Sequence, residues 1–357
     1  MFGKLTSLVM AIAAASLGAA QTAEAAYPVI FFHGATGNKT NGFEIEKNLT
    51  AEGRAYVALD FCQVECSVKT SIYSQIQGAI KQIRGIVSSD ARFKNGYHFL
   101  AHSQGASVAR GVIEEMDDHK VHSFISMAGD GNGIFYGPQA SDQVPLQVLL
   151  QALGPFAIDT KDFDFSKYGS ATWNGKVQRD FTELSSTRKD LQATNAIINT
   201  YRPPIAGANA AWLSTNTFLP KVNNLEQCGT NTTCSNDQKR RKANFLKLKA
   251  AHFFASPQDD IQSPWQTCIL GKYTDVASIN EVETKFSSFK IVDMKDTAEY
   301  KQDLYGLQTL DKAGRLHLHA VPNVGHNCWL FDYVPVAQTA TCLHDPVYSK
   351  NIYPVLV

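Results

Sequence analysis

The stretch HFLAHSQGAS (98–107) decides the fold, because in it an apolar run stops at a serine with small residues on both sides. The run GYHFLA (96–101) predicts a buried β-strand, and the apolar face of QGASVARGVIEEMDDH (104–119) predicts a helix. Ser103 therefore lies in a tight strand-to-helix turn, with an alanine before it and a glycine after it, each two places away. This arrangement is typical of a nucleophile elbow, normally Gly-x-Ser-x-Gly, which exposes the serine hydroxyl at a helix N-terminus.

Strand and helix patterns alternate on both sides of this turn. The apolar run YPVIFFHG (27–34) suits a strand buried on both faces of a parallel sheet, and SIYSQIQGAIKQIRGIV (71–87) carries isoleucines at helical spacing. Further strands are expected at 55–61, at 121–129, in the second half of 245–256 and at 315–322. Alternation with short links predicts an α/β protein with a mostly parallel central sheet.

The alternation lapses between about 131 and 224, where several prolines and many polar residues occur but no clear strand. We expect this segment to be a helical and irregular cap, inserted into a single domain that covers 26–357. Its stretch PLQVLLQALGPFAI (145–158) predicts an apolar groove for an acyl chain, because large apolar residues fall on one helical face: Leu146, Leu149, Leu150, Leu153 and Phe156. The alternative is that this face only packs the cap onto the core.

The partners of an elbow serine follow it in the order acid, then histidine. PQDDIQSPW (257–265) follows a predicted strand and offers Asp259 and Asp260, which compete for the role of orienting carboxylate. His326 follows the last predicted core strand and is expected to act as general base and then acid. His102, the neighbour of the serine, is expected to be structural because the turn aims it differently.

A serine hydrolase also needs two N–H donors for the oxyanion. Gln104 follows the nucleophile and supplies one by position. The other is expected from the loop HGATGN (33–38) after the first strand, most simply from Ala35, since the flanking glycines let the backbone approach closely.

The N-terminal 25 residues predict a secretory signal peptide cut before Ala26, since a short apolar run ends in Ala-Glu-Ala. A membrane anchor is the alternative, but the run is shorter than a span needs. Secretion makes disulfides available to the seven cysteines. The expected pairs are Cys62–Cys66, Cys228–Cys234 and Cys328–Cys342, with Cys268 left over. Asn-x-Thr sequons predict glycosylation at Asn38, Asn48 and Asn231.

The composition excludes some partners. Lys+Arg and Asp+Glu balance at 33 each, so neither nucleic acid nor an anionic membrane is indicated as the main partner. The cysteines show no CxxC spacing, so we expect no metal and no other cofactor. We expect a monomer without stable membrane insertion.

Several stretches resemble the palmitoyl-protein thioesterase family of α/β-hydrolases, which remove fatty acyl groups from thiols. They are HGATG (33–37), GYHFLAHSQGASVARGVIE (96–114), FISMAGDGNGIF (124–135), FLPKVNNLEQ (218–227), PQDDIQSPWQTCILGKY (257–273) and DLYGLQTLDKAGRLHLHAVPNVGHNCW (303–329). The resemblance implies that Asp259, rather than Asp260, is the triad acid. The Pro-Trp-Gln and Gly-His-x-x-Trp stretches resemble the second palmitoyl-protein thioesterase type, whereas the part from 137 to 218 matches poorly.

The resemblance implies a thioester hydrolase acting on S-acylated proteins or peptides, or on acyl-CoA, in a secreted or lysosome-like location. Two alternatives stay open. One is a lipase or carboxylesterase, because a triad fit for oxygen esters also serves thioesters, whose thiolate leaves easily. The other is an inactive lipid-binding protein on a hydrolase fold.

Overall fold

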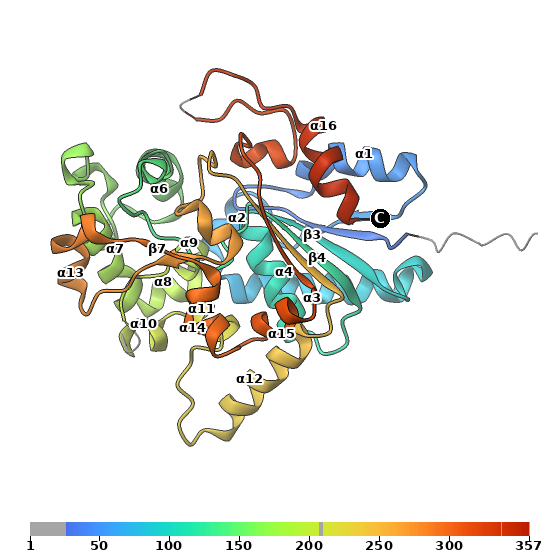
Figure 1. The fold of residues 1–357 in the computed structure, drawn as a ribbon, viewed down its shortest axis with the longest axis horizontal. Helices are drawn as coiled ribbons and strands as arrows, with labels where there is room; N and C mark the ends of the chain where they lie inside the picture. Colours follow the sequence, from blue (N-terminus) through green and yellow to red (C-terminus); the bar gives the residue numbers. More distant parts are fainter. Residues whose placement is uncertain (1–25, 207–209, 337, 357) are drawn as a thin grey trace, which may run out of the picture.

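The computed structural model describes residues 26–206, 210–336 and 338–356, so the expected signal peptide lies outside the described residues. The central sheet has six parallel strands in the order β2-β1-β3-β4-β5-β8, and a separate antiparallel pair joins β6 to β7 (Figure 1). The strands are β1 (Val29–Phe32), β2 (Tyr56–Ala58), β3 (Tyr97–His102), β4 (Val121–Met127), β5 (Ala250–Ala255), β6 (Lys272–Tyr273), β7 (Ile291–Val292) and β8 (Leu316–Ala320). Every expected strand of the sheet is present, and the chain has the α/β-hydrolase fold.

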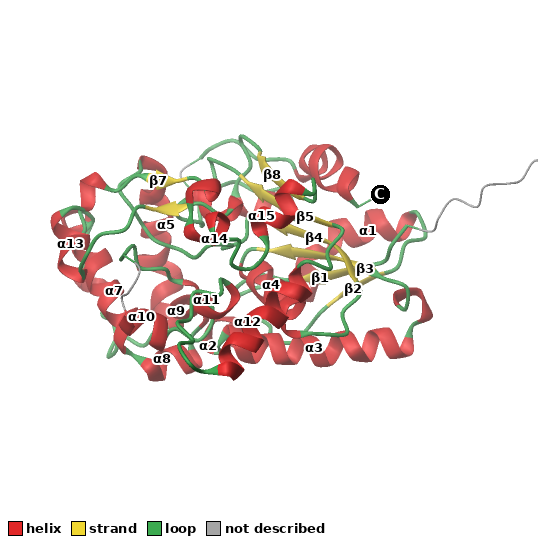
Figure 2. Ribbon diagram, turned by 60° about the horizontal axis from the view of Figure 1, so that its bottom comes forward, coloured by secondary structure: helices red, strands yellow, loops and turns green. Residues whose placement is uncertain are grey.

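Helices cover both faces of this sheet (Figure 2). On one face α3, α4 and α12 pack through an apolar cluster that includes Ile76, Val112 and Phe245. On the other face α1 and the segment around α16 pack through a cluster that includes Leu49 and Trp329. The helices of the core are α1 (Phe43–Ala51), α2 (Glu65–Lys69), α3 (Ile72–Ser89), α4 (Gln104–Glu115), α11 (Leu219–Val222), α12 (Thr232–Phe245), α14 (Ala298–Lys301), α15 (Leu307–Lys312) and α16 (His344–Val347).

The register of the parallel strands sets where a site can form. Phe32 pairs with Ala101, and Ala101 pairs with Ser126, so the carboxyl ends of β1, β3 and β4 meet at one edge of the sheet. Ser126 pairs in turn with Phe253 near the end of β5. Loops that follow these strands therefore converge, which is where ligands bind in open α/β sheets.

A second lobe, the cap, lies beside the sheet, on the left in Figure 1. Its own apolar cluster joins residues between 135 and 201 to residues between 273 and 289. The expected cap segment, 131–224, is therefore completed by a later segment that carries β6, α13 and β7. The cap helices are α5 (Gln143–Val148), α6 (Gly154–Ala157), α7 (Lys176–Thr187), α8 (Lys189–Thr194), α9 (Ala196–Thr200), α10 (Ala210–Thr215) and α13 (Ile279–Thr284).

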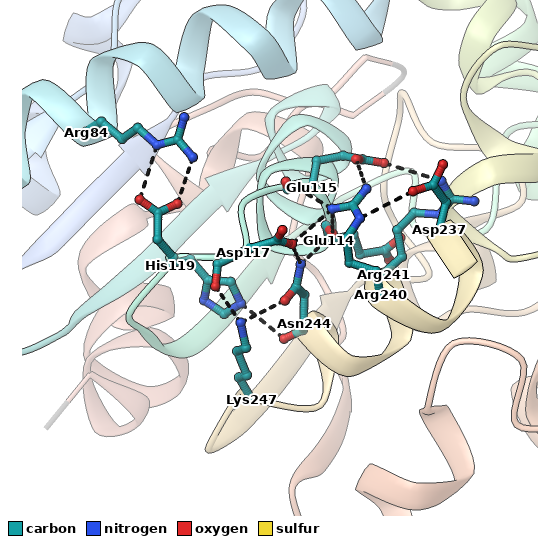
Figure 3. Close-up of polar contacts among 11 residues, drawn as sticks. Arg84, Glu114, Glu115, Asp117, His119, Asp237, Arg240, Arg241, Asn244 and Lys247 are labelled. Atoms are coloured by element: carbon teal, nitrogen blue, oxygen red, sulfur yellow. Dashed lines mark hydrogen bonds and ion pairs between the residues drawn. The ribbon is translucent and has the colours of Figure 1, made fainter. Parts of the chain in front are cut away.

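Helix α12 brings the chain back from the cap to β5, and a polar cluster fastens it to the end of α4 (Figure 3). Arg240 donates to the Glu115 carboxylate at 2.5 Å and pairs with Asp117 at 3.1 Å. The side-chain amide of Asn244 donates to the Glu114 carbonyl at 3.0 Å and to Asp117 at 2.7 Å. Because β5 follows α12 closely, these contacts fix the strand from which Asp259 and Asp260 emerge.

The three expected disulfides, Cys62–Cys66, Cys228–Cys234 and Cys328–Cys342, are present, and Cys268 is a buried thiol. Among the glycosylation sequons, Asn48 and Asn231 are exposed and Asn38 is half-buried. Glycosylation at these residues stays a prediction. Within the described ranges, no helix combines the length and the apolar character needed to cross a membrane.

Candidate active site

Ser103 lies at the turn between β3 and α4 in a strained backbone conformation, with φ 55° and ψ −133°. Such strain is the mark of a nucleophile elbow and is tolerated only where the surroundings enforce it. Gly105 explains the need for small neighbours, because a Cβ there would lie 2.5 Å from the carbonyl oxygens of Phe32 and His33. The elbow thus depends on close contact between the start of α4 and the end of β1.

Asp259 and His326 meet at the same edge of the sheet. The Nδ1 atom of His326 lies 3.0 Å from both carboxylate oxygens of Asp259. One of those oxygens also accepts from the backbone N–H groups of Ile261 and Gln262, at 2.9 and 2.8 Å. The carboxylate is therefore held by its own loop and presents a fixed acceptor to the imidazole.

Asp260, the competing acid, contacts the backbone of His326 instead of its ring. One Asp260 oxygen accepts from the His326 N–H at 2.9 Å, and the other accepts from the Tyr333 hydroxyl at 2.7 Å and the Val336 N–H at 2.5 Å. The two neighbouring carboxylates therefore differ in what they contact: Asp259 contacts the imidazole ring, and Asp260 contacts the backbone of the loop that carries it.

The surroundings raise the pKa of His326. Burial by itself disfavours the imidazolium, but the charge and hydrogen bond of Asp259 outweigh burial, with smaller contributions from Asp260 and Asp130. A carboxylate that stabilises the imidazolium is the arrangement by which a histidine accepts a proton from a serine.

His102 also contacts the histidine loop. Its Nε2–H donates to the carbonyl oxygen of His326 at 2.9 Å, and burial lowers the pKa of His102 to about 3. The ring is therefore neutral, which agrees with the structural role expected of it. Its backbone contact with His326, 224 residues away in the chain, carries no signal in the sequence.

The loop after β1 packs directly against the nucleophile. A Cβ on Gly34 would lie 2.8 Å from the Cβ of Ser103, so glycine is required there. The Gly37 N–H donates to the Gly34 carbonyl at 3.1 Å, which closes a turn with Ala35 and Thr36 at its centre. Gln104 is the first residue of α4, so its N–H has no acceptor within the helix. The two expected oxyanion donors, Ala35 and Gln104, thus flank Ser103.

A cavity of about 520 Å³ opens at Ser103 and His326. Its core wall includes Gly34, Ala35 and Asn327, and its apolar side is formed by Val148, Ala152, Leu153, Phe156, Ile261, Leu330 and Phe331. Ser103, His326 and the expected oxyanion residue Ala35 therefore share one concave site, whose remaining wall comes from the cap.

The expected acyl groove needs correction. Leu153 and Phe156 line the cavity, but Leu146, Leu149 and Leu150 are buried inside the cap against phenylalanines such as Phe163 and Phe181. The helix face that carries the three leucines therefore packs the cap, and Val148 and Ala152 line the cavity beside Leu153 and Phe156. A π-helical turn at Leu149–Leu153 adds a residue to the helix and shifts its faces, which a regular helical period does not anticipate.

The sequence analysis also missed Asp130, in the loop after β4. Burial raises the pKa of Asp130 to about 6, although the carboxylate accepts a hydrogen bond from Ser107 at 2.5 Å. Its charge acts on His326. The sequence feature that could have identified Asp130 is its position in a glycine-rich loop directly after a core strand.

Comparison with known proteins identifies relatives over most of the chain. The palmitoyl protein thioesterase family matches residues 28–326. The lysosomal thioesterase PPT2-B of Xenopus laevis is 28% identical over 306 residues, covering 85% of this chain and 87% of the relative. The human lysosomal thioesterase PPT2 is 24% identical over 304 residues (85% and 82%), and palmitoyl-protein thioesterase 3 of Dictyostelium discoideum is 22% identical over 315 residues (88% and 89%).

Proposed function

Because the chain belongs to the palmitoyl protein thioesterase family, we propose that it hydrolyses long-chain fatty acyl thioesters with a triad of Ser103, His326 and Asp259. Membership makes the chain a thioester hydrolase. The single observation that carries the triad is the contact of His326 Nδ1 with both oxygens of Asp259, beside a cavity that His326 shares with Ser103.

The reaction proceeds through an acyl-enzyme. His326 Nε2 takes the proton of the Ser103 hydroxyl as the serine oxygen attacks the thioester carbonyl. The negative oxygen of the tetrahedral intermediate is stabilised by the N–H groups of Ala35 and Gln104. The carbon–sulfur bond then breaks, and the imidazolium protonates the departing thiolate. In the second half, His326 takes a proton from a water molecule that attacks the acyl-enzyme carbonyl, the bond between that carbon and the Ser103 oxygen breaks, and the imidazolium returns the proton to Ser103 as the fatty acid leaves.

The apolar side of the cavity supplies the affinity for the acyl chain. Each methylene that it takes from water contributes about 0.8 kcal/mol. Val148, Ala152, Leu153 and Phe156 from the cap face Ile261, Leu330 and Phe331 from the core across this space. The leaving thiol, of an S-acylated protein or peptide or of coenzyme A, extends from the open side.

The proposed location is the secretory pathway, ending outside the cell or in a lysosome-like compartment. Three disulfides suit an oxidising compartment. Two of the relatives described above are named lysosomal thioesterases.

A fluorophosphonate probe and matched substrates test the proposal. We expect the probe to label Ser103 in the purified chain, as peptide mass spectrometry would record, and to lose that label in Ser103→Ala. We also expect faster hydrolysis of a palmitoyl thioester than of the oxygen ester of the same chain length. A labelled protein that prefers the oxygen ester would indicate a lipase, and an unlabelled folded protein would indicate a binding protein.

A further inference from the structure

Ser67 lies behind the oxyanion loop, outside the walls of the cavity. It belongs to α2 and is fully buried. Its hydroxyl accepts a hydrogen bond from the Thr36 N–H at 2.7 Å and donates to the Val64 carbonyl at 2.6 Å. Its carbonyl oxygen accepts from the side-chain amides of Gln104 and Gln75, at 2.7 and 2.8 Å. One residue thus contacts both segments that supply the proposed oxyanion donors.

The first contact holds the turn that contains Ala35. Thr36 has φ 57°, at the third position of the turn closed by Gly34 and Gly37, where a type II turn requires positive φ. A β-branched residue is disfavoured in this conformation, so the conformation needs outside support. The hydroxyl of Ser67 gives that support by binding the Thr36 N–H, and it leaves the N–H of Ala35 for the cavity.

The second contact holds the start of α4. The Gln104 side chain turns into the protein, where it donates to Ser67 and also lies 3.3 Å from the Gln75 side-chain oxygen. Gln104 is therefore anchored through its amide side chain while its backbone N–H remains the proposed second donor.

Ser67 is itself firmly placed. The Val64 N–H donates to the Gly37 carbonyl at 2.8 Å, and the Cys62–Cys66 disulfide closes the loop before Ser67. Gln75, on the adjoining helix α3, also donates to the Thr70 carbonyl at 2.8 Å. Val64, the Cys62–Cys66 disulfide and Gln75 thus hold Ser67 in place between the oxyanion loop and α4.

We propose that Ser67 is a positioning residue that fixes the N–H groups of Ala35 and Gln104 relative to each other. The inference rests on the proposed serine-hydrolase function. A displaced donor weakens binding of the transition-state oxyanion more than binding of the uncharged substrate, because the preorganised donors act on charge that develops during the reaction.

The test compares Ser67→Ala with Ser71→Ala in the full chain. Ser71 is a buried serine four residues away that caps α3 through Ser74, so its variant reproduces a local loss of stability without a contact to the oxyanion segments. We expect Ser67→Ala to lower kcat on a palmitoyl thioester by about 10- to 100-fold with little change in KM, and Ser71→Ala to leave kcat near that of the parent.

The affinities of two inhibitors distinguish a positioning role of Ser67 from a merely structural one. A long-chain alkyl trifluoromethyl ketone forms a tetrahedral oxyanion on Ser103, whereas a long-chain alkyl thioether only fills the cavity. In Ser67→Ala the ketone should weaken by the same factor as kcat, and the thioether should bind as before. Equal weakening of both inhibitors, or an unchanged kcat, would overturn the inference. If Ser67→Ala does not fold, Ser67→Cys is the second variant, because its side chain has a similar shape and a weaker hydrogen-bond acceptor. It should show a smaller loss of kcat and of ketone affinity, again with unchanged binding of the thioether.

The outcomes also distinguish the two proposals. If the parent chain neither hydrolyses thioesters nor reacts with a fluorophosphonate, the proposed function fails and the inference falls with it. If the parent chain is active and Ser67→Ala matches it, only the role of Ser67 is wrong.

Discussion

The cavity has two walls of different kinds. The core wall holds Ser103, His326 and the loop at Ala35, and buried hydrogen bonds from Asp259, Asp260, His102 and Ser67 tie these groups in place. The cap wall holds Val148, Ala152, Leu153 and Phe156, which meet the cavity through apolar contact, and Phe156 is 39% exposed. The core wall is thus held by polar networks and the cap wall by apolar packing, so under the proposed function we expect a change in the cap wall to alter substrate choice without altering the chemistry.

Removing the nucleophile tests the core wall most severely. Ser103→Ala should lower kcat on palmitoyl thioesters by roughly 10⁶-fold, because triad members act as a unit. Circular dichroism and thermal unfolding should match the parent chain. A folded variant that still turns over substrate at the parental rate would end the serine-hydrolase interpretation.

The two adjacent acids should differ sharply. Asp259→Asn should cost roughly 10⁴-fold in kcat, since the imidazole loses the group that orients it and stabilises its cation. Asp260→Asn should cost about 10-fold, through looser placement of the loop that carries His326. Steady-state kinetics on both variants checks the difference, and a larger loss in Asp260→Asn would reverse the assignment of the triad acid.

Filling the cap wall should change substrate choice without changing chemistry. Val148→Trp should lower kcat/KM for a palmitoyl thioester by about 10- to 100-fold, through lost methylene burial, and leave an acetyl thioester unaffected. Gln147→Trp is the matched control, because Gln147 is exposed on the same helix. Equal loss on long and short chains would show that the two walls are not separable.

A charge inside the cap tests whether the leucines that do not line the cavity stabilise the cap. Leu150→Asp should destabilise the cap by several kcal/mol, because an unpaired carboxylate would be buried among phenylalanines. Thermal unfolding measures the loss. A variant that kept the parental stability and long-chain turnover would mean that Leu150 neither packs the cap nor serves the groove.

Acidic pH should reduce activity through His326. The base must be neutral, and its pKa is raised, so kcat/KM should fall as the pH drops through a value above 6.5. Asp130→Asn removes one of the charges that raise this pKa, and the acidic limb should therefore shift slightly to lower pH. A pH profile of both proteins checks the direction, and a shift to higher pH would contradict it.

The residues of the core wall could be predicted from the sequence, whereas few of those in the cap wall could. Strand patterns and the small-x-Ser-x-Gly turn are local, so the elbow and the positions after β5 and β8 follow from periodicity and chain order. The division of labour between Asp259 and Asp260 depends on contacts across 66 to 76 residues, which no local pattern carries. The prediction of the acyl groove was partly wrong for another reason. Leu146, Leu149 and Leu150 form an apolar helix face, but the sequence pattern does not show whether that face lines the cavity or packs inside the cap.

Several contacts of the core join residues that are far apart in the sequence, and this separation has a consequence for synthesis of the protein. The nucleophile is made early, but the carbonyl that His102 binds belongs to His326, 224 residues later, and Arg54 beside β2 binds the carbonyl of Leu356, 302 residues later. A growing chain that has already folded β1 and β3 therefore has its serine but lacks its base. Because no contact can form before its later residue has been made, the proposed base reaches the proposed nucleophile only after the last core strand has been synthesised, and we expect the nascent chain to be inactive until then.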